Sequence, residues 1–263
     1  MQVRNFQQSE EVFQVTQIPF SVVILAAGKG TRMNSDLPKV LHEIAGRPMI
    51  LRVLDTVSEI GAAQTIVVVG HMRELVEEAV AGIADATVVQ DPPLGTGHAV
   101  LQAEEAVSPN CQEVLILSGD VPLLRASTLE ILLERHRESE CDLTVLSAKA
   151  TNPFGYGRIV RDLDGEFTGI VEEKDANTDQ RNLSEINSGV YVVNRRGLFW
   201  ALHRVKPNNA KGEYYLTDIV GILAKAGKRT QAVNCADFAE LQGINTPAEL
   251  AQAEAAWLAR KAV

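Results

Sequence analysis

A glycine-rich segment with nearby basic side chains is the part of the sequence whose residue types point most directly to chemistry. Residues 25–33 read L-A-A-G-K-G-T-R-M, and Pro38 and Lys39 follow shortly afterwards. Glycines let backbone N–H groups approach an anion closely, and successive N–H groups form a concave anion-binding site. Arg32 offers a planar pair of donors suited to phosphate oxygens, whereas Lys29 and Lys39 offer compact positive charges. The segment therefore predicts phosphate binding.

Two familiar phosphate-binding motifs do not fit this segment. A dinucleotide fingerprint requires a glycine at the position that Met33 occupies. A P-loop requires four residues between its two glycines, whereas Gly28 lies only two residues before Gly30. A glycine-rich turn alone is also compatible with an ordinary strand-to-loop connection. The added arginine and lysine make phosphate binding the stronger interpretation.

The candidate phosphate segment begins where an apolar run at 22–25 ends, and such a run is typical of a buried parallel strand. Further strands are predicted at 65–69, 87–90, 113–117 and 142–148, and helices at 48–60, 73–80, 96–107 and 127–138. This alternation predicts a three-layer α/β fold, in which helices cover both faces of a mostly parallel, Rossmann-like sheet.

Three loops of this predicted sheet are expected to meet. Ligands of parallel sheets bind beyond the carboxyl ends of the strands. The loops that follow Leu25, Gln90 and Leu117 lie at that end, and all three are rich in glycine or polar residues. We therefore expect the phosphate segment to share a binding site with the other two loops.

The pattern changes after about residue 150. Strands are predicted at 157–161, 166–171 and 186–193, and Asp164-Gly165 is a good hairpin turn between the first two. These strands predict a mixed or antiparallel extension of the sheet. Helices are expected at 215–225 and 247–261, the second with Thr246 as its cap and Pro247 at its first position.

The composition limits function and location. A formal charge of −9 over 263 residues argues against a broad nucleic-acid surface, which needs a basic footprint. No apolar run approaches a membrane span, and the N-terminus lacks a basic region followed by an apolar core. Cys111, Cys141 and Cys235 show neither metal-ligand spacing nor a disulfide framework. We expect a cytoplasmic protein that binds neither nucleic acid nor membranes, and no feature indicates an oligomeric state.

Several segments together carry a resemblance to a known family. They are L-A-A-G-K-G-T-R-M at 25–33 with the following Pro38-Lys39, Q-D-P-P-L-G-T-G-H-A at 90–99, S-G-D-V-P-L at 118–123, G-Y-G-R-I at 155–159, I-V-E-E-K-D at 170–175, E-I-N-S-G-V at 185–190 and G-E-Y-Y-L-T-D at 212–218. From about residue 21 to the last helix, the chain resembles the bacterial N-acetylglucosamine-1-phosphate uridyltransferases. The resemblance implies a nucleotide-diphospho-sugar transferase fold. It also implies an enzyme that forms UDP-N-acetylglucosamine and pyrophosphate from UTP and N-acetylglucosamine 1-phosphate.

The resemblance implies that Arg32 and Lys39 are catalytic, because they match positions that contact the triphosphate and offset charge during transfer. It also implies a set of nucleotide-binding residues. The nucleotide-binding positions are Leu25, Ala26, Ala27, Gly28, Gly30, Lys39, Gln90, Gly95, Thr96 and Asp120. The Gln90 amide carries a donor and an acceptor, which suits the edge of uracil. His98 is not expected to be a general base, because it opens a helix and has no evident acidic partner.

The resemblance further implies that Asp120 and Asn245 hold Mg²⁺, a hard cation that takes oxygen ligands. Ordinary turn or capping roles are the alternatives for both side chains. For the sugar, the implied binding residues are Gly157, Glu172, Asn187, Tyr214 and Thr217. A solvated charge cluster is the alternative for residues 172–175.

The resemblance also suggests how the chain is divided. We expect a flexible tail at 1–19 and a nucleotidyltransferase domain at 20–263, with a nucleotide-binding part at 20–150, a sugar-binding part at 151–246 and a C-terminal helix at 247–263. Ser118 stands where many family members have tyrosine. The family usually continues into a left-handed β-helix acetyltransferase domain, but no hexapeptide repeat follows here. We therefore expect no acetyltransferase activity from this chain.

Two other functions remain open on the sequence alone. The same chemistry is possible with another pair of substrates, such as UTP or dTTP with glucose 1-phosphate. A nucleotide-sugar sensor without catalysis is the second alternative, since a fold alone does not fix function. The presence of both Asp120 and Lys39 disfavours the sensor.

Overall fold

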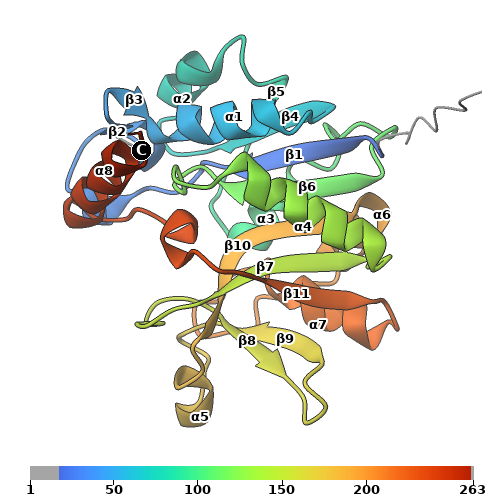
Figure 1. Cartoon of the computed structure of the whole chain (residues 1–263). Helices are drawn as coiled ribbons and strands as arrows, with labels where there is room; N and C mark the ends of the chain where they lie inside the picture. Colours follow the sequence, from blue (N-terminus) through green and yellow to red (C-terminus); the bar gives the residue numbers. More distant parts are fainter. Residues whose placement is uncertain (1–17, 262–263) are drawn as a thin grey trace, which may run out of the picture.

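The computed structural model describes residues 18–261, so most of the expected N-terminal tail lies outside the described residues. Its main strands are β1 (Phe20–Leu25), β4 (Gln64–Val69), β5 (Ala86–Val89), β6 (Glu113–Ser118), β7 (Leu143–Lys149), β10 (Glu185–Asn194) and β11 (Thr230–Cys235). They form one sheet in the order β11-β7-β10-β6-β1-β4-β5 (Figure 1). Adjacent strands on this path are parallel, except that β10 runs antiparallel to both β6 and β7.

A hairpin joins this sheet near the start of β10, as the sequence predicted for the region after residue 150. Strands β8 (Arg158–Arg161) and β9 (Phe167–Val171) pair antiparallel, and β8 also pairs with β10. A separate small ribbon joins β2 (Glu43–Ile44) and β3 (Arg47–Pro48). The predicted fold class, a mostly parallel α/β sheet with a mixed extension, is therefore confirmed.

Helices cover both faces of the sheet, because the side chains of β1 alternate between two apolar clusters. Val22 and Ile24 pack in one cluster with buried residues of α1 (Met49–Glu59), α2 (Arg73–Val80) and α4 (Ala126–Glu138). Val23 packs in the other, with α3 (Thr96–Leu101), α6 (Arg195–Leu202) and α7 (Asp218–Lys225). The two remaining helices are α5 (Thr178–Arg181) and α8 (Pro247–Lys261). No helix within residues 18–261 is long and apolar enough to cross a membrane.

Several elements differ from the expectation, since α5, α6 and the β2–β3 ribbon were not predicted. The helix predicted at 96–107 ends at Leu101. Beyond it, backbone hydrogen bonds join residues three apart instead of four, such as Ala103 N–H to Val100 O and Glu104 N–H to Leu101 O. Ala103 and Val107 are still buried, so the apolar spacing continues beyond the helix. Strand β11 was not predicted, since most of its residues are half-buried and give neither an apolar run nor a clean alternation.

Candidate active site

The loops after β1, β5 and β6 meet at the carboxyl end of the parallel strands. The N–H of Gly119 donates to Leu25 O at 2.9 Å, which joins the loops after β1 and β6. A cavity of about 340 Å³ opens between the three loops. Its lining includes Leu25, Ala26, Ala27, Gly28, Lys29, Lys39, Gln90, Gly95, Thr96, Ser118 and Asp120. The cavity thus collects nearly all of the residues that the sequence predicts for nucleotide binding.

The phosphate segment folds back on itself at Gly30. This residue has φ 60° and ψ 32°, a left-handed conformation that favours glycine. A Cβ atom at Gly30 would lie 2.5 Å from Cβ of Lys39, so the missing side chain also leaves room for the lysine. Buried Met33 and Val40 anchor the chain after the bend. The bend therefore sets the path of the Lys39 side chain.

Replacing Gly30 with alanine is expected to lower both stability and turnover. The left-handed backbone costs a non-glycine residue about 1–2 kcal/mol, and the new methyl group collides with Lys39. Gly82 is a matched control, because its φ is 74° but a Cβ there meets no atom within 4 Å. Thermal unfolding and steady-state turnover of both variants should separate the effects. Gly82→Ala should lose stability but keep its turnover. An equal loss of turnover in the two variants would contradict the role of Gly30 in leaving room for Lys39.

Lys39 lies at the centre of a polar cluster made from three distant segments. Its Nζ contacts Asp120 Oδ2 and donates to Asn245 Oδ1 at 3.0 Å. Arg32 Nη2 donates to the same Asn245 oxygen at 2.9 Å. The side chains of Lys39 and Asp120 are only 15% and 16% exposed, so water screens their attraction weakly. The structure therefore brings together both predicted catalytic cations and both predicted metal ligands.

The donor set of this cluster fits a divalent cation. Asp120 and Asn245 each turn one oxygen towards the ammonium of Lys39, and the Asn245 oxygen also accepts from Arg32. A carboxylate and an amide oxygen are ligands that Mg²⁺ accepts, and this ion usually takes further oxygens from water and phosphate. No group of three or more His, Cys, Asp or Glu side chains placed to hold a metal occurs within the described part of the chain.

The segment expected to select uracil is held in place by residues 213–216. The N–H of Gly97 donates to Tyr214 O at 2.8 Å, and the N–H of Tyr214 donates to Leu94 O at 2.8 Å. Thr96 Oγ1 accepts the N–H of Leu216 at 3.0 Å. A Cβ at Gly95, where φ is 115°, would lie 2.6 Å from Tyr214 O, so only glycine fits there. The backbone of Tyr214, a residue implied for sugar binding, thus holds this segment in place.

Gln90 and His98 form a small network beside this segment. Gln90 is 6% exposed, and its Nε2 donates to Gly95 O at 2.9 Å and lies 3.2 Å from Nδ1 of His98. The other ring nitrogen of His98 lies 3.2 Å from Nε2 of Gln102. Burial lowers the pKa of His98, which favours the neutral ring at pH 7. His98 therefore orients the Gln90 amide, and none of these hydrogen bonds joins it to a carboxylate.

Of the predicted sugar residues, Glu172 lines a second, larger cavity of about 1150 Å³. Arg32 and Glu172 are among its lining residues, so the cavity reaches the catalytic cluster. A Cβ at Gly157 would lie 3.5 Å from Asn187 Cβ and 3.6 Å from Glu172 Oε1. Thr217 Oγ1 donates to Glu172 Oε1 at 3.1 Å. Gly157, Glu172, Asn187 and Thr217 therefore form one polar group.

Two of the lining residues that the sequence did not predict, Tyr215 and Arg158, are buried. Tyr215 is 6% exposed, and its hydroxyl has no hydrogen-bond partner among the described residues. Burial, with smaller effects of nearby carboxylates, raises the pKa of Tyr215 to about 12, so the hydroxyl remains a donor at neutral pH. Arg158 has a side chain only 2% exposed and pairs with Glu173 at 2.6 Å. The sequence Tyr214-Tyr215 contains both candidates, but only the turn geometry decides which one faces the cavity.

Glu172→Gln is expected to change both stability and sugar use. Burial raises the pKa of Glu172, opposed by the Thr217 hydrogen bond. The folded state therefore binds a proton more tightly than the unfolded chain, and wild-type stability falls as pH rises from about 4.5 through the folded pKa. Because glutamine cannot ionise but still accepts from Thr217, the variant should gain stability relative to wild type above this window. Its KM for the sugar phosphate should rise while that for the nucleotide stays unchanged.

Glu173→Gln, at the neighbouring position, is expected to change the folding stability in the opposite direction. Burial disfavours its charge, but Arg158 and the N–H of Gly155 hold the pKa of Glu173 below its ordinary value. The variant should therefore lose stability at neutral pH, because buried Arg158 loses its ion pair. Thermal unfolding between pH 4 and pH 8 checks both variants. The same stability change in both variants would show that burial is not the dominant influence on the pKa of Glu172.

Comparison with known proteins gives the family. The family model described as the MobA-like NTP transferase domain matches residues 22–212, which leaves Tyr214, Thr217 and Asn245 outside the match. The chain is 49% identical over 235 residues to the "Bifunctional protein GlmU" of Syntrophomonas wolfei, with 89% of this chain and 52% of that protein covered. The GlmU of Streptococcus agalactiae is 47% identical, with 88% and 50% covered. That of Desulfotalea psychrophila is 44% identical, with 90% and 70% covered.

Solved structures share the fold at much lower identity. A UDP-glucose pyrophosphorylase complexed with UDP-glucose has a TM-score of 0.72 and 20% identity, and the match covers 92% of this chain and 99% of that one. HddC from Yersinia pseudotuberculosis has a TM-score of 0.65 and 20% identity, with 90% and 99% covered. The chain spans about half the length of the first two GlmU relatives. From the family match and the identities above 40%, the chain belongs to the MobA-like NTP transferase family, in the group that includes the bacterial GlmU proteins.

Proposed function

We propose that this chain transfers a uridylyl group from UTP to N-acetylglucosamine 1-phosphate, releasing pyrophosphate and forming UDP-N-acetylglucosamine. One observation carries the proposal. One hydrogen-bonded cluster, formed by Lys39, Asp120, Asn245 and Arg32, borders two cavities: Lys39 and Asp120 line the smaller cavity, and Arg32 lines the larger. Both cavities are therefore within reach of the same charges, as a transfer between two bound substrates requires.

The smaller cavity suits a pyrimidine nucleotide. Gln90 lies among its lining residues, and its Nε2 is already engaged by Gly95 O and His98, so the amide presents its oxygen as an acceptor for the ring N–H of uracil. The backbone of the phosphate segment and Lys39 border the same cavity and suit the triphosphate. The larger cavity, with the Glu172, Asn187 and Thr217 group, suits the hydroxyl and acetamido groups of the sugar.

The proposed step is a direct in-line displacement. A phosphate oxygen of the sugar phosphate attacks the α-phosphorus of UTP and forms a new P–O bond. The bond from that phosphorus to the bridging oxygen of the β-phosphate breaks, and pyrophosphate leaves with the electron pair. The attacking phosphate is already an anion at neutral pH, so the step needs no general base, which agrees with the supporting role of His98.

Lys39 and Arg32 provide most of the charge stabilisation by the chain itself. Both are held by hydrogen bonds before substrate arrives, so little reorganisation is needed as negative charge develops. Nucleotidyltransferases of this family use a divalent metal ion, and the oxygens of Asp120 and Asn245 support Mg²⁺ here. When bound, this ion would neutralise phosphate charge and help align the reacting groups.

The remaining proposals concern organisation and location. Residues 20–150 provide the nucleotide side and residues 151–246 the sugar side, although Tyr214 and Asn245 of the second part contact the first. A cytoplasmic location is supported by the free thiols of Cys111, Cys141 and Cys235.

A turnover panel tests the proposed substrates. Pyrophosphate release should be measured with UTP and dTTP, each combined with N-acetylglucosamine 1-phosphate and glucose 1-phosphate. UTP with the acetamido sugar is expected to give the highest kcat/KM, by about tenfold or more. Equal or faster turnover with glucose 1-phosphate would assign the site to the alternative reaction.

A further inference from the structure

The segment that carries Asn245 is held by the first turn of α8. Thr246 and Glu249 have the spacing of a capping box, in which the two residues bond each other's backbone. The N–H of Glu249 donates to Thr246 Oγ1 at 3.2 Å. In return, Glu249 Oε2 accepts the N–H of Thr246 at 3.0 Å and also the N–H of Asn245 at 2.7 Å. The carboxylate thus extends the box by one residue and fixes the backbone of Asn245.

The Asn245 side chain depends on this backbone. Its Nδ2 donates to Gly243 O at 3.2 Å, and because the amide is planar, Oδ1 then faces the opposite way, towards Lys39 and Arg32. The N–H of Ile244 donates to Asp120 O at 3.0 Å, which ties the same segment to the loop of the other metal ligand. The separation of the two ligand oxygens is therefore set by residues 243–246.

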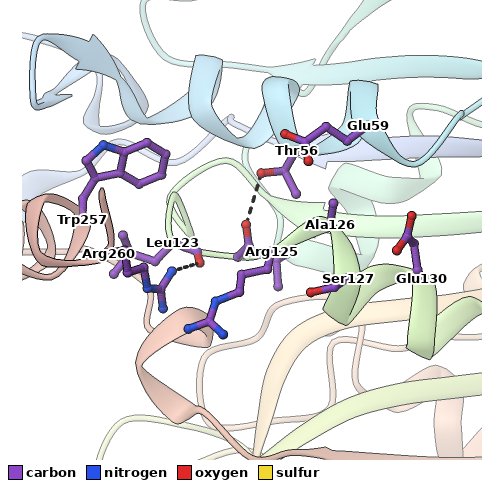
Figure 2. Close-up of a pocket in the computed structure, with 10 residues that line it drawn as sticks. Thr56, Glu59, Leu123, Arg125, Ala126, Ser127, Glu130, Trp257 and Arg260 are labelled. Atoms are coloured by element: carbon purple, nitrogen blue, oxygen red, sulfur yellow. Dashed lines mark hydrogen bonds between the residues drawn. The ribbon is translucent and has the colours of Figure 1, made fainter. Parts of the chain in front are cut away.

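The rest of α8 is anchored independently of its first turn. The guanidinium carbon of Arg52 lies 3.9 Å from the ring centroid of Trp257, and the N–H of Ala45 donates to Glu254 Oε1 at 2.8 Å. Arg260 Nη1 donates to Leu123 O at 2.6 Å, and both residues line a cavity of about 550 Å³ together with Trp257 (Figure 2). Loss of Glu249 should therefore loosen the Asn245 segment without releasing the helix.

We propose that Glu249 is a positioning residue for the metal site, acting through the backbone of Asn245. The proposal rests on the metal role of Asn245 in the proposed function. Glu249 bonds neither Lys39 nor Asp120, and its role is to keep Asn245 Oδ1 aimed at the position that Asp120 also faces. Groups that orient metal ligands in this way typically contribute about 10–100-fold to metal affinity.

The test compares four variants of the full chain by Mn²⁺ binding to the nucleotide-free protein, measured from the free-ion paramagnetic resonance signal. Glu249→Ala should weaken Mn²⁺ binding by about tenfold. Glu249→Gln should restore it, because the glutamine oxygen accepts the same two N–H groups. Thr246→Ala removes the other half of the box, so it should lower the unfolding temperature and leave the affinity near wild type. Asn245→Ala should bind Mn²⁺ at least as weakly as Glu249→Ala.

The apparent activation constant for Mg²⁺ at saturating substrates provides a second readout, in which the variants should keep the same order. Wild-type metal affinity in Glu249→Ala, or an equal loss in Thr246→Ala, would overturn the positioning role. Wild-type affinity in Asn245→Ala would instead remove the metal role of Asn245, and with it that part of the proposed function. The two failures are therefore distinguishable.

Discussion

Replacing Asp120 with alanine is expected to abolish measurable pyrophosphate release from UTP and N-acetylglucosamine 1-phosphate. The variant loses the negative charge that faces Lys39 and the carboxylate oxygen available to a divalent ion. A loss of about 4 kcal/mol in transition-state stabilisation corresponds to roughly a thousandfold lower rate. A coupled assay of pyrophosphate release measures the effect directly.

The control for Asp120 separates charge from shape. Asp120→Asn keeps the side-chain volume but removes the charge, so it should also lose nearly all turnover. Asp55→Ala removes a carboxylate that forms a surface ion pair with Arg47, with the Asp55 side chain 49% exposed, and should leave turnover unchanged. An Asp120→Ala enzyme with turnover near wild type would rule out the assigned role of this carboxylate.

Replacing Lys39 with methionine is expected to lower kcat by about 100–1000-fold, the range seen when one stabilising donor is removed from an active site. Methionine has a similar length, so packing near Gly30 is largely kept while the ammonium is lost. Asp120 then loses its positive partner, and Oδ1 of Asn245 keeps only the hydrogen bond from Arg32. Steady-state kinetics with each substrate varied in turn gives kcat and both KM values.

Lys29 provides the comparison for Lys39. It lines the same cavity and carries the same charge, but it is exposed and does not belong to the Asp120 and Asn245 cluster. Lys29→Met should therefore raise the KM for UTP modestly, with little change in kcat. If Lys39→Met stayed within threefold of wild type in kcat, charge stabilisation by Lys39 would be excluded.

The strands that were predicted well are those buried on both faces. β1, β4 and β6 are almost wholly buried, so each forms a short apolar run that stands out in the sequence. The position of β10 was not predictable, because its insertion between β6 and β7 depends on pairing between distant segments. The edge strand β11 was missed because its half-buried side chains leave no periodic signal.

The active site was predictable where its residues follow buried strands. Because ligands bind at the carboxyl ends of parallel strands, the sequence pattern alone was enough to group the segments of Lys39, Gln90 and Asp120. Asn245 was reached only through the family resemblance, since it lies 206 residues from Lys39 in the sequence and follows no strand of this sheet directly. Tyr215 and Glu249 were missed, because their roles depend on which way one turn and one helix cap face.

The most direct measurement is the product yield of the wild-type chain with UTP, N-acetylglucosamine 1-phosphate and Mg²⁺, and with each substrate omitted in turn. A cleft in which Lys39 and Asp120 act on two bound substrates should release pyrophosphate and UDP-N-acetylglucosamine in equal amounts, and only when both substrates are present. Tight binding of UTP or UDP-N-acetylglucosamine without any pyrophosphate would contradict it, and would identify the chain as a sensor of nucleotide sugars.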